Sequence, residues 1–464
     1  MPPQTAQISR LIDALRLRGP STARELSEAL GVSQPTISRA VAAAGGRVVR
    51  WGQTNRVRYA ALRDVRRLGT EWPIFRIDTQ GRPREFGRLT ALYGAGSLVQ
   101  TANPPRWMRD DFIDGYFPGV PWFLDDQRPQ GFLGRQFARR WSSDLGLPTD
   151  ILRWDDDAVL AALLLHGEDG TGDFVLGEDA LERALQAEPN AIPSASRTHR
   201  YAELAEAALA GESVGSSAAG EQPKFTATVQ DADGAVRHVI VKFSEPVESN
   251  SAARRWADLL ICEHLANEVL AEHGNPGAHT ELVWSHGRMC LEVTRFDRVG
   301  THGRRGCVTL AAWSDAHDGE RDDWARATER MQQQGWIGPG TQEQARQRWW
   351  FGRMIGNNDM HFGNLSFFLG DALPLQLTPN YDMLPMMYRP ASSGEVVTRE
   401  FRPATPTSDL VQWREAAALG ELFWRRVLQH AEISGDFRRI AEANGEAISR
   451  MRQRFGADAN LTMP

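Results

Sequence analysis

A short polar loop in the last third of the chain limits the folds available to it. The loop runs from Gly356 to Asn364 with the sequence GNNDMHFGN, and Tyr381-Asp382 follows on a later segment. An Asp and an Asn five positions apart, here Asp359 and Asn364, followed by a second Asp is the spacing that places a base and two magnesium ligands around a transferred phosphate. A plain Asn- and Gly-rich turn is the alternative, and the loop alone does not decide between them.

Lysine usage favours the phosphate-binding interpretation. The chain has 53 Lys and Arg residues together, but just two of them, Lys224 and Lys242, are lysines. A compact ammonium contacts phosphate oxygens in a way that the planar guanidinium cannot reproduce, so lysine is expected to persist in an arginine-biased chain where phosphate is bound. The alternative is that two lysines fell together by chance.

The two lysines lie in a region that reads as a small-residue loop, a strand, a tight turn and a second strand. The loop runs from Ser216 to Lys224, the turn is at Asp233-Gly234, and the second strand ends at Lys242. Glycine and other small residues let backbone N–H groups approach a phosphate. The helical pattern over Arg254–Glu272 contains Glu263, which either pairs with Lys242 or is a surface glutamate. Spacing alone slightly favours the surface position.

Charge is distributed unevenly along the chain. The formal net charge is -6, yet residues 1–68 contain twelve Arg and only four Asp or Glu, a net charge of +8. A basic module on an acidic body is the asymmetry expected of a nucleic-acid-binding appendage.

The basic module has the pattern of a winged helix-turn-helix. Apolar residues recur at helical spacing from Ile8 to Leu15, Thr22-Ala23-Arg24-Glu25 is a capping box, and Ser33 is expected to cap a helix over Gln34–Ala43. The last of these helices suits the major groove, and the arginine-rich hairpin after it suits the phosphates. A winged helix used for protein contact is the alternative. The expected DNA contacts are Gln34, Thr36, Ser38, Arg39, Arg56 and Arg58.

Composition points to a protein of a reducing cytoplasm. Cys262, Cys290 and Cys307 show no close pair and no metal-type spacing, so they are expected to be buried, unreactive thiols. The longest purely apolar stretch, Ala158–Leu165, is too short to span a bilayer. We therefore expect a cytoplasmic protein with no membrane partner.

The remaining C-terminal part is predicted to be mostly helical. Before it, the stretch from Cys290 to Arg298 is expected to be a strand leading into a linker between two lobes, with a backbone able to hydrogen-bond an adenine. The helices expected after this linker are Trp324–Gln333, Gln342–Met354, Asp409–Ala417, Gly420–His430 and Ala441–Arg454.

Taken in order, these motifs resemble those of the HipA serine/threonine kinases, the toxins of bacterial type II toxin–antitoxin systems. The resemblance covers residues 200–400 with specific motifs and residues 100–460 more loosely. The matching motifs are Ser217-x-x-Gly220-x-Gln222-x-Lys224, Val241-Lys242, Thr294-Arg295-Phe296-Asp297-Arg298, Asn357-x-Asp359-x-His361-x-x-Asn364 and Tyr381-Asp382.

The resemblance implies an α+β fold with the two lobes of HipA and the protein kinases, here carrying a winged helix-turn-helix domain at the N-terminus. The best-known members take their DNA binding from a separate antitoxin, so this chain looks like a HipA-like branch with its own DNA-binding domain. The expected domains are a winged helix-turn-helix over 1–68, a HipA-type N-terminal subdomain over 69–195, a kinase N-lobe with the phosphate-binding loop over 196–298, and a mostly helical C-lobe over 299–464.

The resemblance also implies a role for each matched position. Asp359 would be the catalytic base, and His361 would brace the catalytic loop. Asn364 and Asp382 would bind magnesium. The residues expected to bind or cradle ATP are Ser217, Gly220, Gln222, Lys224, Lys242, Glu263, Val293, Thr294 and Phe296.

Ser217 has a second expected role. It matches the serine that family members autophosphorylate to switch themselves off. The alternative is that Ser217 is one more small residue in a tight turn, where Ser216 would serve as well.

The expected cofactors are ATP and Mg²⁺, and the expected partners are a protein substrate with a Ser or Thr acceptor and duplex DNA. Translation factors are among the family's targets, and the target and a homodimer both stay open here. Two other functions also remain open: a transcription regulator with an inactive or nucleotide-sensing kinase-like body, and a small-molecule phosphotransferase. The intact set of Lys242, Asp359, Asn364 and Asp382 argues against an inactive body.

Overall fold

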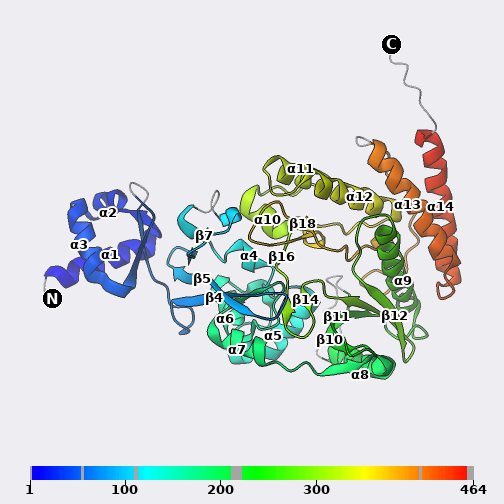
Figure 1. Cartoon of the computed structure of the whole chain (residues 1–464), viewed down its shortest axis with the longest axis horizontal. Coiled ribbons are helices and arrows are strands. Elements are labelled where there is room, and N and C mark those ends of the chain that lie inside the picture. The colour runs from blue at the N-terminus through cyan, green and yellow to red at the C-terminus, as the bar shows by residue number, and fades with distance from the viewer. Residues whose placement is uncertain (1–2, 54–56, 109–112, 211–221, 407–409, 457–464) are drawn as a thin grey trace, which may run out of the picture. The chain divides into compact units, whose positions relative to one another are not determined.

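The computed structural model describes residues 3–53, 57–108, 113–210, 222–406 and 410–456 (Figure 1). The chain divides into two compact units. Unit 1 comprises Met1–Pro129 and Arg140–Ala187, and unit 2 comprises Gln130–Arg139 and Glu188–Pro464. Within these described ranges, the helices lack the length and the apolar character needed to cross a membrane.

The N-terminal part of unit 1 consists of three helices and a small antiparallel sheet of order β1-β3-β2. Leu11, Leu15, Leu26 and Ile37 form the centre of its core. The elements are α1 (Pro3–Arg18), β1 (Ser21–Thr22), α2 (Ala23–Leu30), α3 (Gln34–Ala44), β2 (Val48–Trp51) and β3 (Arg58–Ala61).

The starts of α2 and α3 differ in how they are capped. At α2 the capping box forms as expected: the Thr22 hydroxyl accepts from the Glu25 N–H at 3.3 Å, and the Glu25 carboxylate accepts from the Thr22 N–H at 2.6 Å. At α3 the expectation was wrong in part. Ser33 is at the N-cap position, but its side chain makes no cap hydrogen bond and lies 2.9 Å from the Thr36 hydroxyl instead. Local pairing between two hydroxyls has replaced the bond to the backbone.

The rest of unit 1 is built on a five-stranded antiparallel sheet of order β7-β6-β5-β4-β8. Phe86, Phe123 and Phe174 pack edge-on and tilted against one another in its core. The elements are β4 (Glu71–Ile77), β5 (Pro83–Leu92), β6 (Gly96–Gln100), β7 (Tyr116–Pro118), α4 (Trp122–Asp125), α6 (Asp156–His166), β8 (Phe174–Leu176) and α7 (Glu178–Gln186), and α5 (Gly131–Leu145) is divided between the two units.

Unit 2 begins with a second five-stranded sheet, of order β12-β13-β11-β10-β9. Tyr201 and Ala205 of α8 pack on one face of it, against Val239 and Val241. On the other face, Glu263 of α9 contacts β11. The elements are β9 (Ala191–Pro193), α8 (Arg197–Ala210), β10 (Lys224–Gln230), β11 (Val236–Phe243), α9 (Ser251–Glu272), β12 (Thr280–Ser285) and β13 (Arg288–Thr294).

The C-terminal part of unit 2 is mostly helical, as expected. It also contains a short hairpin and a three-stranded sheet of order β16-β17-β18. The elements are β14 (Arg298–Val299), β15 (Gly303–Arg304), β16 (Cys307–Thr309), α10 (Leu310–His317), α11 (Trp324–Gln333), α12 (Pro339–Ile355), β17 (Ser366–Phe368), β18 (Gln376–Leu377), α13 (Leu410–Gln429) and α14 (Gly435–Gly456).

The helices at the C-terminus correct one prediction. Two helices were expected, Asp409–Ala417 and Gly420–His430, but α13 runs from Leu410 to Gln429 without a break. A Cβ at Gly420 would lie 2.7 Å from the Cβ of Met354, so the glycine allows α13 to approach α12 closely. The Trp424 indole N–H donates to the Met354 carbonyl at 3.1 Å across the same contact. Gly420 is therefore a packing position and not a helix end.

Candidate active site

The two lysines of the chain are direct neighbours on adjacent strands. In the antiparallel pairing of β10 and β11, Lys224 lies opposite Lys242, so their side chains project from the same face of the sheet. Lys242 is buried, with 6% of its surface exposed, and Lys224 is half-buried. The pair therefore provides two ammonium groups at one end of a hairpin.

Lys242 contacts two carboxylates that come from distant parts of the sequence. Its Nζ donates to both oxygens of Glu263, at 2.5 and 2.7 Å, and to the carboxylate of Asp382. The Asp382 backbone N–H also donates to Glu263, at 3.1 Å. Strand β11, helix α9 and the segment of Asp382 thus meet at one ammonium.

The surface position that spacing favoured for Glu263 was wrong. Glu263 is completely buried, because α9 turns this side of the helix toward the sheet. Its neighbours on α9, Leu259, Leu260 and Ala266, are also completely buried. A buried carboxylate is tolerable only with charged or hydrogen-bonding partners, and Lys242 supplies them.

The three charges shift one another's pKa values in a consistent way. Burial alone would lower the pKa of Lys242, but the carboxylates of Asp382 and Glu263 outweigh it and raise that pKa above its usual value. Burial raises the pKa of Glu263, against the pull of Lys242. Burial also acts to raise the pKa of Asp382, but Lys242 and Lys224 lower it to about 2. At neutral pH Lys242 is therefore protonated and Asp382 is ionised.

The polar loop follows directly from the end of α12. Gly356 ends the helix in the left-handed conformation, with φ of 75°. Asn357 is buried, and its side chain accepts from the Asp359 N–H at 3.0 Å and donates to the Asp382 carbonyl at 3.4 Å. Asn364 then donates its Nδ2–H to the Asp359 carbonyl at 3.0 Å. These bonds close the loop and bring Asp359, Asn364 and Asp382 into one region.

Asn357 is a site residue to which sequence reasoning gave no role. It was quoted as the first residue of the motif, but the spacing pointed to the Asp and the second Asn. Its position directly after a helix-ending glycine was the available signal, since a short amide there can pair with the backbone two residues on.

His361 makes its contacts within the loop and with α11. Its Nδ1 accepts from the Gly363 N–H at 3.1 Å, and its carbonyl accepts from the Trp324 indole at 3.1 Å. This geometry suits a residue that braces the loop, and the role itself stays a prediction.

Aromatic side chains lie beside the loop. Tyr381 donates its hydroxyl to the Gly363 carbonyl at 2.9 Å, and its ring is 5.7 Å from that of Phe296. Phe296 also contacts Phe368 of β17, at 6.0 Å between ring centroids. Phe296 is thus close to the segment of Asp382, and its place in a nucleotide pocket stays a prediction.

The other residues expected around adenine divide between the two faces of the sheet. Val293 pairs with Ile240, two residues from Lys242, so its side chain is on the lysine face. Thr294 is on the opposite face, where its hydroxyl accepts from Arg237 at 3.2 Å. Its backbone N–H donates to the His279 carbonyl at 2.9 Å. Only the first of these two side chains can face a ligand held by Lys242.

Part of the expected phosphate loop lies outside the described residues. This holds for Ser217 and Gly220, and also for Ser216. Gln222, the first residue described after that gap, is half-buried just before β10.

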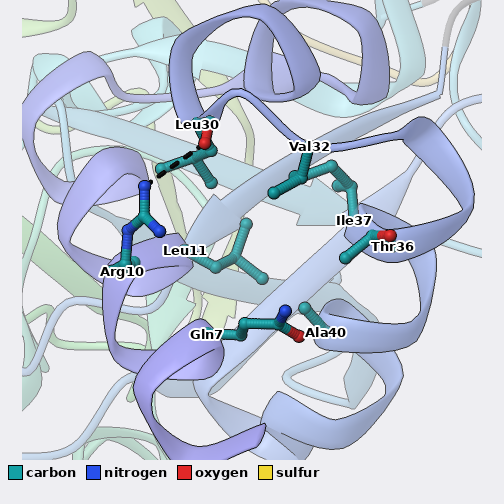
Figure 2. A pocket seen from close by; sticks show the side chains of 8 residues that line it. All are labelled: Gln7, Arg10, Leu11, Leu30, Val32, Thr36, Ile37 and Ala40. Carbon is teal, nitrogen blue, oxygen red and sulfur yellow. Dashed lines mark hydrogen bonds between the residues drawn. The ribbon is translucent and has the colours of Figure 1, made fainter. Parts of the chain in front are cut away.

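The expected DNA-contacting residues are distributed over α3 and β3. Gln34, Ser38 and Arg39 are exposed on α3, and Arg58 is exposed at the start of β3. Thr36 was expected to be exposed but is half-buried. Figure 2 shows it in a pocket between α1 and α3, together with Gln7, Arg10 and Leu30. Arg56 lies outside the described residues.

The donor atoms of the loop fit a magnesium ion. Over the described ranges, no three or more His, Cys, Asp or Glu side chains are grouped to hold a metal. Asn364 and Asp382 instead offer an amide and a carboxylate oxygen, which are hard ligands of the kind that Mg²⁺ takes. Because Asn364 uses its Nδ2 on the Asp359 carbonyl, its Oδ1 is the atom left for a cation. Because the pKa of Asp382 is lowered to about 2, its carboxylate is ionised at neutral pH and can also bind a cation.

A mixed α/β fold in which a lysine of β11 pairs with a glutamate of α9, beside an Asp/Asn loop that follows α12, is the arrangement of the HipA class. Residues 216–452 match the family model described as the HipA-like C-terminal domain, and residues 68–185 match that of the YjjJ-like toxin, middle domain. The chain belongs to the HipA-like toxin family, which confirms the family to which the motifs pointed. The fused winged helix-turn-helix and the kinase activity stay predictions.

Two relatives illustrate this membership. The chain is 38% identical to the toxin YjjJ of Escherichia coli K12 over 453 residues, which covers 96% of this chain and 99% of the relative. It also aligns with a chain of the Shewanella oneidensis MR-1 toxin–antitoxin complex of HipA, HipB and operator DNA. That alignment has a TM-score of 0.50 and 15% identity, and it covers 83% of this chain and 97% of the other. At this identity it shows a shared fold.

Proposed function

We propose that this protein is an ATP- and Mg²⁺-dependent serine/threonine protein kinase. The observation that carries the proposal is the position of Lys242, a buried ammonium held between Glu263 and Asp382. In kinases a Lys–Glu pair of this kind holds the lysine for the ATP phosphates, and an Asp at the end of the site binds the metal. The carboxylate of Asp382 would turn from Lys242 to the metal when nucleotide binds.

The loop residues take complementary parts in this proposal. Asp359, oriented through its backbone by Asn357 and Asn364, would accept the proton of the substrate hydroxyl. Asn364 and Asp382 would hold Mg²⁺, which when bound neutralises charge on the transferred phosphate. Lys224 would add a second ammonium beside Lys242. Val293 and Phe296 would line the adenine.

Phosphotransfer with labelled ATP tests the proposal. Protein incubated alone reports autophosphorylation, and a cell lysate added to it reports a protein substrate. Asp359→Asn is expected to lower turnover by roughly 10²–10⁴, the usual contribution of a positioned base. Asp315→Asn is the control, because Asp315 is exposed on α10 and its ion pair with Arg321 is at the surface.

The same experiment separates the rival functions. Label in protein that depends on Asp359 supports the kinase. Label confined to small molecules indicates a small-molecule phosphotransferase, and ATP binding without transfer indicates a regulator with an inactive body. Unchanged transfer in a folded Asp359→Asn variant would sink the assignment of the base.

We also propose that Ser217 is autophosphorylated and thereby switches the kinase off. A phosphoserine adds about two negative charges, which here would fall seven residues from Lys224 in sequence and compete with ATP for the two lysines. Peptide mass spectrometry after incubation with ATP and Mg²⁺ is expected to find phosphate on Ser217. Phosphate on other residues alone, or a fully active Ser217→Asp variant, would remove this switch.

For the N-terminal module, we propose duplex DNA binding as a winged helix-turn-helix. Exposed polar residues at the start of α3 suit base edges, and the net charge of +8 on residues 1–68 suits phosphates.

The salt dependence of DNA affinity tests this proposal. The logarithm of the affinity is expected to fall linearly with the logarithm of the salt concentration, by about 0.9 per phosphate contact. Arg39→Ala and Arg58→Ala should each reduce this slope, while Arg402→Ala on the surface of unit 2 should not. Salt-independent binding, or none at low salt, would contradict the proposal.

A further inference from the structure

We infer that Arg348 is a positioning residue that fixes the segment carrying Asp382, and through it the Mg²⁺ affinity of the site. This inference rests on the proposed kinase function. Arg348 lies on α12, with 2% of its surface exposed, and it belongs to none of the motifs that identified the site.

The guanidinium of Arg348 joins α12 to two other segments of the chain, one at residues 275–276 and one at Thr378. Its Nε donates to the Asn275 side chain at 2.5 Å, and its two terminal nitrogens donate to the carbonyls of Thr378 and Pro276, at 2.9 and 3.2 Å. Thr378 precedes Asp382 by four residues. The guanidinium presents five N–H donors on three nitrogen atoms of a rigid plane, so it reaches three separated acceptors at once. A lysine has three donors on a single nitrogen atom, and a glutamine has two donors, so neither reproduces this spread.

The segment from Thr378 to Asp382 is held at successive residues. The Asn380 N–H donates at 2.8 Å to the Pro276 carbonyl, the same atom that Arg348 contacts. The Asn380 side chain donates to Asn267 of α9 at 3.0 Å, one helical turn after Glu263. Arg348 therefore fixes one end of a short segment whose other end contacts Lys242 and Glu263.

Burial of this cation has a cost that a purely structural role would not require. The acceptors of Arg348 within the described residues are all neutral, and burial lowers its pKa to about 9. A buried charge without a carboxylate partner is costly, and an apolar residue of similar volume would often be as stable. An apolar residue at this position would lose the three hydrogen bonds that hold residues 275–276 and Thr378 to α12.

Metal affinity is the property that this arrangement controls. Residues that orient metal ligands typically contribute 10–100-fold to metal affinity or activity. Asp382 has its backbone in the left-handed region, with φ of 54°, which Asp tolerates better than most L residues but which is still a minor conformation of the chain. Loosening Thr378 and Asn380 would let Asp382 leave this conformation.

Two measurements on the variants Arg348→Lys and Arg348→Gln test the inference: amide hydrogen exchange and Mg²⁺ titration of phosphotransfer. Arg353→Lys is the matched control. Arg353 is exposed on the same helix, over the Trp349 ring. We expect faster exchange of amides 376–383 in both Arg348 variants. We also expect about a tenfold rise in the Mg²⁺ concentration for half-maximal phosphotransfer, with kcat largely restored at saturating Mg²⁺. The control should show neither change.

The two readouts keep this inference distinct from the proposed function. Wild-type protein without phosphotransfer would refute the kinase proposal, and the exchange of amides 376–383 alone would then decide the positioning role. Exchange of this segment at the wild-type rate would overturn the inference. So would a uniform loss of folded protein in both Arg348 variants without faster local exchange, because Arg348 would then be a general structural residue.

Discussion

Lys242 is the single residue on which the site depends most, because one ammonium satisfies both Glu263 and Asp382. Lys242→Arg keeps the charge but puts a larger planar group into a buried space. We expect weaker ATP binding and lower turnover, and overpacking that costs about 1–3 kcal/mol of stability. ATP affinity and turnover of this variant are the measurements. If the ATP affinity and turnover of Lys242→Arg equal those of wild type, the scarcity of lysine in this chain does not indicate a phosphate-binding role.

Asp382 leads to a prediction about pH. Its pKa of about 2 in the folded protein lies below its value of about 3.9 in an unfolded chain, so the ionised carboxylate stabilises the fold. This contribution is fully present above about pH 4 and is lost as the pH falls toward 2. Asp382→Asn should therefore be less stable than wild type at pH 7, and the difference should shrink below about pH 4.

Urea unfolding of both proteins at several pH values between 7 and 3 measures that difference. Asn tolerates the left-handed backbone of this position, so the substitution removes the charge without adding strain. A stability difference that stays constant down to pH 3 would contradict the depressed pKa of Asp382.

The residues of the site were predictable to unequal degrees. Asp359, Asn364 and Asp382 could be proposed from spacing, because the chemistry requires those residue types on a short loop and a later segment. Lys242 could be proposed because the chain has two lysines among its 53 Lys and Arg residues. The burial of Glu263 could not, since its helix has apolar residues on several sides and the sequence does not say which side meets the sheet. Arg348 gave no signal at all, because its three acceptors come from residues distant in sequence.

At the scale of elements, Gly420 is the position where sequence and structure differ most instructively. Glycine weakens a helix by about 1 kcal/mol relative to alanine, so a helix that begins at Gly420 after a break was a reasonable expectation. Contact between α12 and α13 outweighs that preference, because it needs a position without a side chain. Propensity could not reveal a contact between residues that are 66 positions apart, here Met354 and Gly420.

Alanine at Gly420 is expected to destabilise unit 2 although alanine favours helices. The added Cβ would lie 2.7 Å from the Met354 Cβ, which belongs to the helix and cannot swing away. Overpacking of this kind costs about 1–3 kcal/mol. Gly340→Ala is the control. Gly340 is on α12, and a Cβ added there would meet open space, so this substitution should be neutral or stabilising. Equal effects of the two substitutions in thermal unfolding would contradict the close approach of α13 to α12.

The two helix starts of the N-terminal module give a second comparison. Thr22→Ala removes a hydroxyl that caps α2, and this is expected to cost about 1 kcal/mol in the opening of that helix. Ser33→Ala should cost much less, because Ser33 makes no side-chain cap bond. Hydrogen exchange of the amides of α2 and α3 measures both values. A larger effect of Ser33→Ala would show that the pairing of Ser33 with Thr36 matters more than the capping box.

At the scale of the whole molecule, phosphotransfer and DNA binding are expected to separate by mutation. The residues proposed for the two activities lie in different units of the chain, so no side chain is shared between them. Asp359→Asn should lower phosphotransfer by roughly 10²–10⁴ and leave the DNA dissociation constant unchanged at every salt concentration. Arg39→Ala should lower the salt slope of DNA binding by about 0.9 and leave phosphotransfer unchanged. Measuring both activities on each full-length variant decides the matter. Loss of both activities in either variant would contradict this independence and would mean that phosphotransfer and DNA binding are coupled.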